Sequence, residues 1–160
     1  MIKLVPIDEN NYSECLKLSV FESQRGFVAT NVKSLAQAYI HRDRTEPYCI
    51  YHDDTMVGFV QIISDDENKE NMSLWRYMID QRYQGMGYGK EALKVLIENI
   101  RSRNRFKTMT LSYEPENTLA EKLYSSFGFV PTGVIDEGEV EMILKLQIIS
   151  IKALFSLSFR

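Results

Sequence analysis

Cysteine is scarce in this sequence: only Cys15 and Cys49 are present, and they do not form a CxxC pair. A disulfide framework or a zinc knuckle needs more cysteines at closer spacing, so both are excluded. His41 and His52 also stand apart from any second ligand at metal spacing, and we predict no metal site. Both cysteines are therefore expected to be reduced, buried thiols in a cytoplasmic protein.

Long apolar runs and an excess of positive charge are also missing. No stretch approaches the ~20 apolar residues of a membrane span, and residues 1–6 lack the apolar core of a signal peptide. The formal net charge is −3, which argues against a nucleic-acid-binding protein. A mildly acidic protein tolerates cationic substrates better than anionic polymers. We expect a small-molecule substrate, with neither nucleic acid nor a membrane as partner.

The composition that is present suits one globular domain. The chain has 160 residues, of which 44% are hydrophobic and 26% charged, values typical of a single domain with a proper core. We expect this domain to span residues 1–146. Residues 147–160 form an atypical apolar tail that includes Ile151, Phe155 and Phe159. Such a tail must be covered by its own domain or by a partner; it is either a dimer element or an appendage from an altered reading frame.

Hydrophobic periodicity predicts an alternation of strands and helices. Strands are expected at residues 2–7, 47–51, 56–63, 72–79, 108–113, 129–134 and 140–146. Helices are expected at residues 9–18, from Asn31 or Ser34 onward, after the glycine loop with an apolar face from Ala92 to Ile100 and an end near residues 101–104, and at 118–127. Asn117 is the expected N-cap of the last helix and Gly128 its end. This order predicts an α/β (α+β) fold with a mixed sheet of about seven strands and about four helices.

Three glycines at every second position are the most informative motif. Gly85, Gly87 and Gly89 lie between a hydrophobic strand and an amphipathic helix. Glycine lets a backbone approach a ligand closely, and the start of a helix adds unpaired N–H groups and a positive dipole end. Together these features favour phosphate binding, with a flexible turn as the alternative. The spacing is not GxGxxG, and Glu91 replaces the Ser or Thr that ends a P-loop.

Two motifs in order resemble the GNAT superfamily of N-acetyltransferases. The Q/R-x-x-G-x-G/A motif of that family matches residues 84–89. Its second signature, an Asn at a strand end and then Leu-Tyr and Gly-Phe, matches Asn117, Tyr124 and Gly128 with their neighbours. Residues 24–36 and 74–80 look like those of bacterial spermine/spermidine acetyltransferases. The resemblance implies a sheet splayed at the cofactor site, acetyl-CoA as cosubstrate without a metal, and a primary amine acceptor, with spermidine or spermine favoured.

The resemblance also assigns the donor site. Gln84 would order the glycine loop, and Asn117 would contact the pantetheine arm. Main-chain groups of Met78 and Ile79 would lie beside the thioester, and one N–H there would polarise its carbonyl. The Lys90 side chain either adds charge or is merely solvated. The backbone that would cradle the pyrophosphate belongs to Gly85, Met86, Gly87, Tyr88, Gly89 and Lys90.

Tyr124 is the expected general acid, because the family places this tyrosine near the CoA sulfur. A phenol with a pKa of about 10 is protonated at neutral pH and can donate to a thiolate. Without the motif, a packing tyrosine on an amphipathic helix would be the simpler interpretation.

The general base is less clear from the sequence. Residues 72–79 contain no Glu or Asp, although many family members use a carboxylate directly or through water. Water itself is one alternative. The carboxylates that remain as candidates are Glu22, Glu114, Glu139 and Glu141, with Asp80 close to the cofactor loop.

The acceptor side rests on three residues. Glu22 lies in the irregular connection 21–31, which lines the acceptor side in this fold, and is expected to bind substrate. Trp75 and Tyr77 could offer aromatic faces to a cationic chain, with core packing as the alternative. Other hypotheses are another small amine, such as an aminoglycoside, a protein N-terminus, or a non-catalytic CoA-binding domain. A homodimer is also considered.

Overall fold

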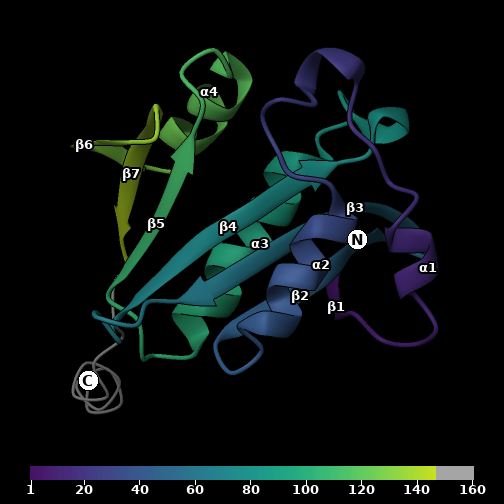
Figure 1. Cartoon of the computed structure of the whole chain (residues 1–160), viewed down its shortest axis with the longest axis horizontal. Coiled ribbons are helices and arrows are strands. Elements are labelled where there is room, and N and C mark those ends of the chain that lie inside the picture. The colour runs from purple at the N-terminus through teal and green to yellow at the C-terminus, as the bar shows by residue number, and fades with distance from the viewer. Residues whose placement is uncertain (147–160) are drawn as a thin grey trace, which may run out of the picture.

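The computed structural model describes residues 1–146, and the tail 147–160 lies outside the described residues. The described part confirms the expected mixed sheet of seven strands with four α-helices (Figure 1). The strands are β1 (Ile2–Pro6), β2 (Thr45–His52), β3 (Thr55–Ser64), β4 (Asn71–Ile79), β5 (Thr108–Tyr113), β6 (Val130–Asp136) and β7 (Glu139–Lys145). The helices are α1 (Tyr12–Cys15), α2 (Asn31–Ile40), α3 (Tyr88–Ser102) and α4 (Thr118–Ser126), with short 3-10 helices η1 (Glu22–Gln24) and η2 (Gln81–Tyr83).

The strand order in the sheet is β1-β2-β3-β4-β5-β7-β6. Only β4 and β5 are parallel, joined by the crossover helix α3; the other neighbours are antiparallel. Helix α2 lies in front of the sheet in Figure 1 and α3 behind it. The sheet therefore separates two apolar layers, one on each face.

Each layer has its own core. The α3-side core is the larger, and its buried members include Leu74 of β4, Leu96 of α3, Leu111 of β5, Tyr124 of α4 and Met142 of β7. The α2-side core gathers Cys15, Leu18, Cys49, Met56, Phe59 and Met78. As expected, both cysteines are buried, and they form no disulfide with each other. No helix within residues 1–146 is long and apolar enough to cross a membrane.

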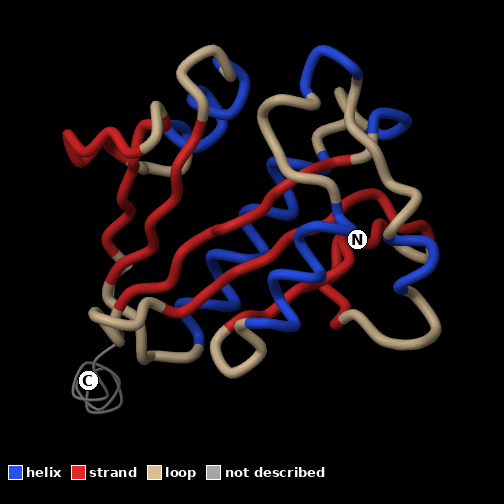
Figure 2. Tube along the Cα trace, in the orientation of Figure 1, coloured by secondary structure: helices blue, strands red, loops and turns tan. Residues whose placement is uncertain are grey.

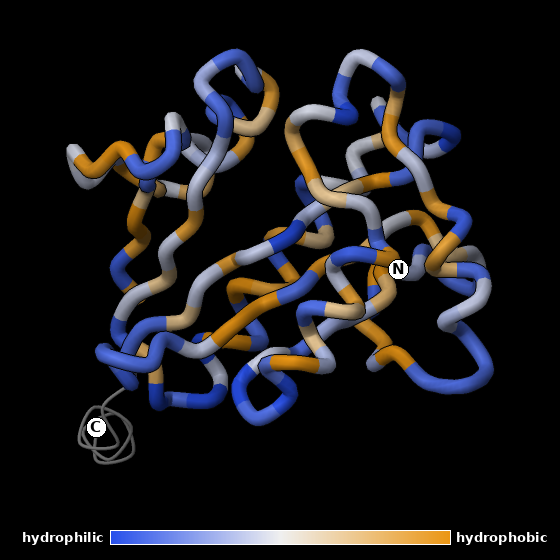
Figure 3. Tube along the Cα trace, viewed as in Figure 1, coloured by the Kyte–Doolittle hydropathy of each residue, from blue (hydrophilic) through white to orange (hydrophobic). Residues whose placement is uncertain are grey.

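Helix α3 forms because its apolar residues recur at helical spacing. Ala92, Leu93, Leu96, Ile97 and Ile100 are all buried against the sheet, which is the stripe expected of an amphipathic helix. The hydrophobic positions of this helix alternate with hydrophilic ones in Figure 3. Such a stripe stabilises the helix chiefly through tertiary packing rather than intrinsic propensity.

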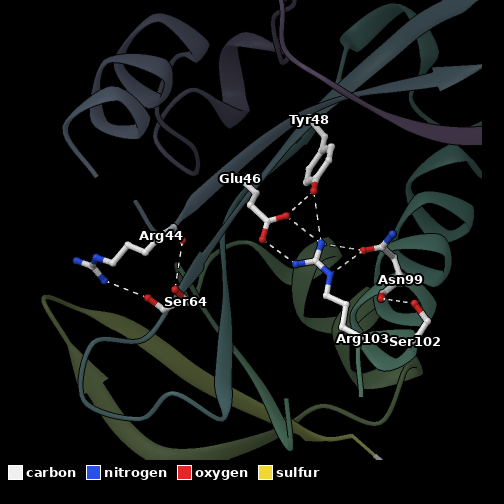
Figure 4. Close-up of polar contacts among 7 residues, drawn as sticks. All are labelled: Arg44, Glu46, Tyr48, Ser64, Asn99, Ser102 and Arg103. Carbon is white, nitrogen blue, oxygen red and sulfur yellow. Dashed lines mark hydrogen bonds and ion pairs between the residues drawn. The ribbon is translucent and has the colours of Figure 1, made fainter. Parts of the chain in front are cut away.

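The end of α3 is fastened by one arginine of the basic run at residues 101–107. Arg103 donates from both terminal nitrogens to the Glu46 carboxylate, at 2.7 and 2.9 Å (Figure 4). Tyr48 and Asn99 complete the network. A bidentate pair of this kind fixes geometry as well as charge. Arg103 thus joins α3 to β2 instead of being freely solvated.

Two local predictions about the N-terminal helices are wrong. The helix expected at residues 9–18 is only the single turn Tyr12–Cys15. Asp8 and Asn11 exchange side-chain-to-backbone hydrogen bonds before it, which is the reciprocal pattern of a capped helix start, but the turn ends after Cys15. The N-cap of α2 is Thr30, whose Oγ1 accepts from the Lys33 N–H at 3.3 Å, rather than Asn31 or Ser34.

The sheet is splayed in its middle, as the resemblance implied. Strands β4 and β5 pair only from Asn71–Leu74 to Thr108–Leu111, although β4 continues to Ile79 and β5 to Tyr113. In Figure 2 the two strands start together near the described end of the chain and then diverge. The last five residues of β4 therefore have a strand neighbour only on the β3 side.

A β-bulge at Trp75 changes which face each β4 residue occupies. The register passes from Ile62–Leu74 directly to Gln61–Arg76, so Trp75 is an extra residue. Before the bulge, Leu74 belongs to the α3-side core; after it, Tyr77 and Ile79 pack there while Met78 enters the α2-side core. Arg76 consequently lies on the α2 face.

Candidate active site

An open cleft of about 890 Å³ occupies the gap between β4 and β5. Its walls come from the connection after α1, the ends of both strands, the glycine loop, α4 and the β6–β7 turn. A cleft of this size suits a small-molecule site. The sheet architecture thus brings segments that are far apart in sequence to one place.

The glycine loop forms one end of the cleft and leads into α3. Gly85 and Gly87 have φ angles of +78° and +85°, which only glycine adopts readily. Gly87 is the N-cap of α3 and offers no side chain to bond the first-turn N–H groups, so these groups remain available to an anion. Gly85, Tyr88 and Gly89 line the cleft, whereas Met86, Gly87 and Lys90 lie in the same loop and first turn outside that lining.

Replacing Gly87 by alanine should weaken CoA binding about tenfold without unfolding the protein. A Cβ at Gly87 meets no atom within 4 Å, but a left-handed conformation costs an L-residue roughly 1–2 kcal/mol. The loop would relax and misdirect its N–H groups. Calorimetric titration with CoA measures the effect, and Gly26→Ala, where φ is ordinary and space is open, is the matched control. Equal affinities in both variants would contradict the assigned phosphate site.

Gln84 orders the loop through its side chain. Its Nε2 donates to the Ile79 carbonyl at 3.0 Å, which ties the loop to the end of β4. The Gln84 and Gln24 amides also exchange hydrogen bonds, at 2.8 and 3.0 Å. The predicted ordering role therefore has a geometric basis, and it involves Gln24, which sequence reasoning missed because the partner lies sixty residues away.

Two tyrosines line the cleft from the α3 side, Tyr77 half-buried and Tyr124 buried. The Tyr77 hydroxyl donates to the Gly89 carbonyl, so this residue fastens the first turn of α3 to β4. Tyr124 is 7% exposed and packs edge-on against Phe129, with ring centroids 5.9 Å apart. Burial raises the pKa of the Tyr124 phenol well above its usual value. This phenol is consequently protonated at neutral pH and is suited to act as an acid rather than as a base.

Main-chain groups of β4 face the opening. Met78 and Ile79 line the cleft beyond the last β4–β5 pair. Their side chains pack into the α2-side and α3-side cores respectively. Since β5 pairs with β4 only as far as Leu74, this edge of β4 is free to pair with an extended ligand.

Asn117 and Trp75 also line the cleft. The Asn117 side chain accepts from the Ala120 N–H at 3.2 Å and caps α4, as the sequence predicted. Trp75 has His41 at its edge, with centroids 5.9 Å apart, and the Arg76 guanidinium 5.0 Å from its ring centroid. The ring of Trp75 is thus already in contact with a cation of the protein itself.

Carboxylates gather at the end of the cleft away from the glycine loop. Of the sequence candidates, Glu114, Glu139 and Glu141 line the cleft, and Asp136 and Glu137 of the β6–β7 turn join them. The loop from β5 into α4 is hydrophilic in Figure 3. The turn acids were missed because a turn between strands is ordinarily solvated; only the fold shows that this turn faces the cleft.

Two other predicted acids lie outside the cleft lining. Glu22 is exposed and pairs with Arg25 at 3.4 Å. Asp80 is 1% exposed and accepts hydrogen bonds from the Ser19 N–H and from Arg82. Burial acts to raise the pKa of Asp80, but the hydrogen bonds outweigh it and lower the pKa. Asp80 is therefore a structural anion. Among residues 1–146 no group of three potential metal ligands occurs.

Comparison with known proteins agrees with this geometry. The acetyltransferase (GNAT) family profile matches residues 7–129. A spermine/spermidine N(1)-acetyltransferase from Bacillus subtilis is 31% identical over 151 residues, which cover 91% of this chain and 99% of that protein. The structure of spermidine N-acetyltransferase from Vibrio cholerae with CoA and spermine has a TM-score of 0.75 at 15% identity, covering 92% of this chain and 96% of that one. The aminoglycoside acetyltransferase AAC(6')-Ib with coenzyme A also has a TM-score of 0.75, at 16% identity and coverages of 91% and 95%.

Proposed function

Since the chain belongs to the GNAT family of acetyltransferases, we propose that it transfers the acetyl group of acetyl-CoA to a primary amine of a polyamine such as spermidine or spermine. The observation that carries this proposal is a single cleft with two unlike ends. One end offers an unpaired helix N-terminus for phosphate, and the other gathers carboxylates for cationic groups.

The glycine loop is the proposed pyrophosphate site. Backbone N–H groups of residues 85–90 would hold the phosphate oxygens, with Gln84 keeping the loop in place. The pantetheine arm, which resembles a peptide, would pair with the open edge of β4 at Met78 and Ile79. Asn117 would contact the arm from the start of α4. The acetyl thioester would then lie where β4 and β5 separate.

Tyr124 is the proposed proton donor to the leaving thiolate. Acetyl-CoA supplies an activated acyl group, and the residues around it must move two protons away from the attacking nitrogen and one onto sulfur. Tyr124 lines the cleft on the α3 side, and burial keeps its phenol protonated. A positioned acid of this kind contributes roughly 10²–10⁴-fold to the rate.

The carboxylate end is the proposed acceptor site. A polyamine carries several ammonium groups, and each needs a counter-charge in a partly enclosed site. The five cleft carboxylates meet that need. Trp75 and Tyr77 stay candidates for substrate contact, although Tyr77 already binds Gly89. Glu22 stays a prediction as a residue of the acceptor entrance. The named activity of the Bacillus relative supports a polyamine.

An amine panel tests the proposal. The purified chain is mixed with acetyl-CoA and with spermidine, spermine, a monoamine, an aminoglycoside or an N-terminal peptide, and thiol release is followed. We expect the polyamines to give kcat/KM at least about tenfold above the monoamine, which corresponds to about 1.4 kcal/mol. Preference for the aminoglycoside or peptide would reassign the acceptor. CoA binding without turnover of any amine would favour a non-catalytic CoA-binding domain. The cytoplasmic location and the homodimer stay predictions.

A further inference from the structure

Acetylation of an ammonium group requires a base as well as an acid. Two protons leave the nitrogen during amide formation, while the released sulfur takes up one from Tyr124. The base must reach the attacking nitrogen and the acid must reach the leaving sulfur, and these two atoms are different substituents of the reacting carbon, so we look for the base away from the acid. The location of Tyr124 therefore restricts where the base can lie.

The two faces of β7 separate the acid side from the opposite side. Met142 and Leu144 belong to the same α3-side core as Tyr124, and Val140 packs against it. Side chains alternate along a strand, so Glu139 and Glu141 lie on the other face. That is the face on which the bulge at Trp75 places Arg76 of β4. The carboxylates of β7 thus approach the splay from the side opposite Tyr124.

Two cleft carboxylates, Glu139 and Glu114, combine partial burial with freedom from hydrogen bonds within residues 1–146. Asp136 and Glu137 are exposed in the β6–β7 turn. Glu141 is half-buried but accepts from the Thr132 hydroxyl at 2.8 Å, and it pairs in register with Ser112. Glu139 is also half-buried, and within residues 1–146 no side chain or backbone group donates a hydrogen bond to its carboxylate.

Glu139 lies farther than Glu141 from the point where β4 and β5 separate, in the part of the sheet where the two strands no longer pair. Strand β5 separates from β4 after Leu111, and its last residue Tyr113 pairs with Val140, next to Glu139. Glu114 continues from that strand and lines the same cleft. Glu114 lies just beyond the end of β5, in the loop that leads into α4. Its placement therefore depends on a loop, whereas Glu139 is held by a paired strand.

The charges around Glu139 tune it toward proton acceptance. Burial raises the pKa of its carboxyl first, and the neighbouring Glu114, Glu137 and Asp136 carboxylates raise it further. Arg76 on β4 acts in the opposite direction and keeps the pKa from rising more. A carboxyl with a raised pKa is a better base than an ordinary one, as general-base catalysis requires.

We propose that Glu139 is the general base that takes the proton from the acceptor ammonium. This proposal rests on the proposed acetyltransferase function. The ammonium N–H bond breaks and its proton moves to a Glu139 carboxylate oxygen. The nitrogen lone pair then forms the C–N bond as the C–S bond breaks. Tyr124 gives its proton to sulfur, and the second nitrogen proton restores the phenol through water. Glu139 releases its proton to solvent, so that one acetamide, one thiol and one proton are formed.

The test is Glu139→Gln, compared with Glu141→Gln as the matched loss of one charge on the same strand face. With spermidine at pH 7.5, Glu139→Gln should lower kcat about 100-fold. Glu141→Gln should raise KM several-fold and change kcat little. Unchanged CoA affinity and unfolding midpoint show that both variants are folded.

A pH series separates proton removal from simple charge attraction. The wild-type kcat should fall as pH drops through a value above the ordinary glutamate pKa of about 4.3, because the base must be ionised. The kcat deficit of Glu139→Gln should shrink toward about pH 10, where free amine is abundant. A variant that keeps its kcat, or whose deficit is independent of pH, would overturn the role of Glu139. If the wild type acetylates spermidine in the same experiment, such a result overturns only the role of Glu139. If the wild type acetylates no amine, the proposed acetyltransferase function itself is wrong.

Discussion

Replacing Tyr124 by phenylalanine is expected to lower kcat about 1,000-fold while CoA affinity stays within about twofold. Tyr124 is buried in the α3-side core and also lines the cleft. Phenylalanine keeps the ring and its contact with Phe129, so packing is conserved and only the proton is lost. The leaving thiolate would then depart without a donor.

Steady-state kinetics with spermidine and calorimetric titration with CoA measure the two quantities. Tyr77→Phe is the matched control because it removes a hydroxyl from a second cleft tyrosine, the one bonded to Gly89. That control should weaken the first turn of α3 by about 1 kcal/mol and affect CoA binding more than kcat. A Tyr124→Phe enzyme with normal kcat would remove Tyr124 from the mechanism. Since burial raises the pKa of Tyr124, its protonated form should persist beyond pH 9, with no loss of kcat from this group below that pH.

The largest expected effect on stability comes from Gly58→Ala, which should reduce the free energy of unfolding by about 3 kcal/mol. Gly58 pairs with Ile79 in the sheet. A Cβ there would lie 2.4 Å from the Met78 carbonyl oxygen and 2.9 Å from Ile79 Cδ1. A backbone oxygen cannot move as a flexible side chain can. The end of β4 would be pushed away from β3, which also disturbs the main-chain groups that face the cleft.

Urea unfolding of Gly58→Ala and Gly26→Ala gives the comparison. A Cβ at Gly26 meets nothing within 4 Å, so that variant should differ from wild type by less than about 0.5 kcal/mol. If Gly58→Ala were equally mild, the close approach of β3 to β4 could not be a packing requirement. If Gly58→Ala were as stable as the wild type but inactive, the protein would have relieved the strain by moving β4.

Features governed by local rules could be predicted from the sequence. The helix that follows the glycine loop, the cap at Asn117 and the helix end at Gly128 all follow from residue types within a few positions. The splay was implied by the two motifs of the family. Strand alternation also placed the seven strands correctly to within a few residues.

Features that depend on partners far away in the sequence could not be predicted from it. No residue near Gln84 in the sequence indicates that Gln24 is its partner, because the two side chains meet only once β4 and the connection before α2 have folded together. The helix expected after β1 ends at Cys15, whose carbonyl accepts from the Asn31 side chain sixteen residues away. Glu114, Glu139 and Glu141 could be named as candidates, but their ranking needed the strand faces, and the turn acids Asp136 and Glu137 were not identified. Glu22 and Glu139 look alike in sequence and differ only in what surrounds them.

The extra residue in β4 makes the bulge, rather than any one side chain, the feature that decides which face the rest of the strand presents. If Trp75 stayed in the chain but the bulge were straightened, the four residues that follow would exchange faces. Arg76 and Met78 would then be directed into the α3-side core, and Tyr77 and Ile79 out of it. Deleting Trp75 would instead leave these four residues on their present faces, because Leu74 and Arg76 already pair with the adjacent residues Ile62 and Gln61. An alignment with a relative that lacks the bulge therefore needs its gap at Trp75, and an alignment without that gap would misassign the cleft residues of β4 that follow.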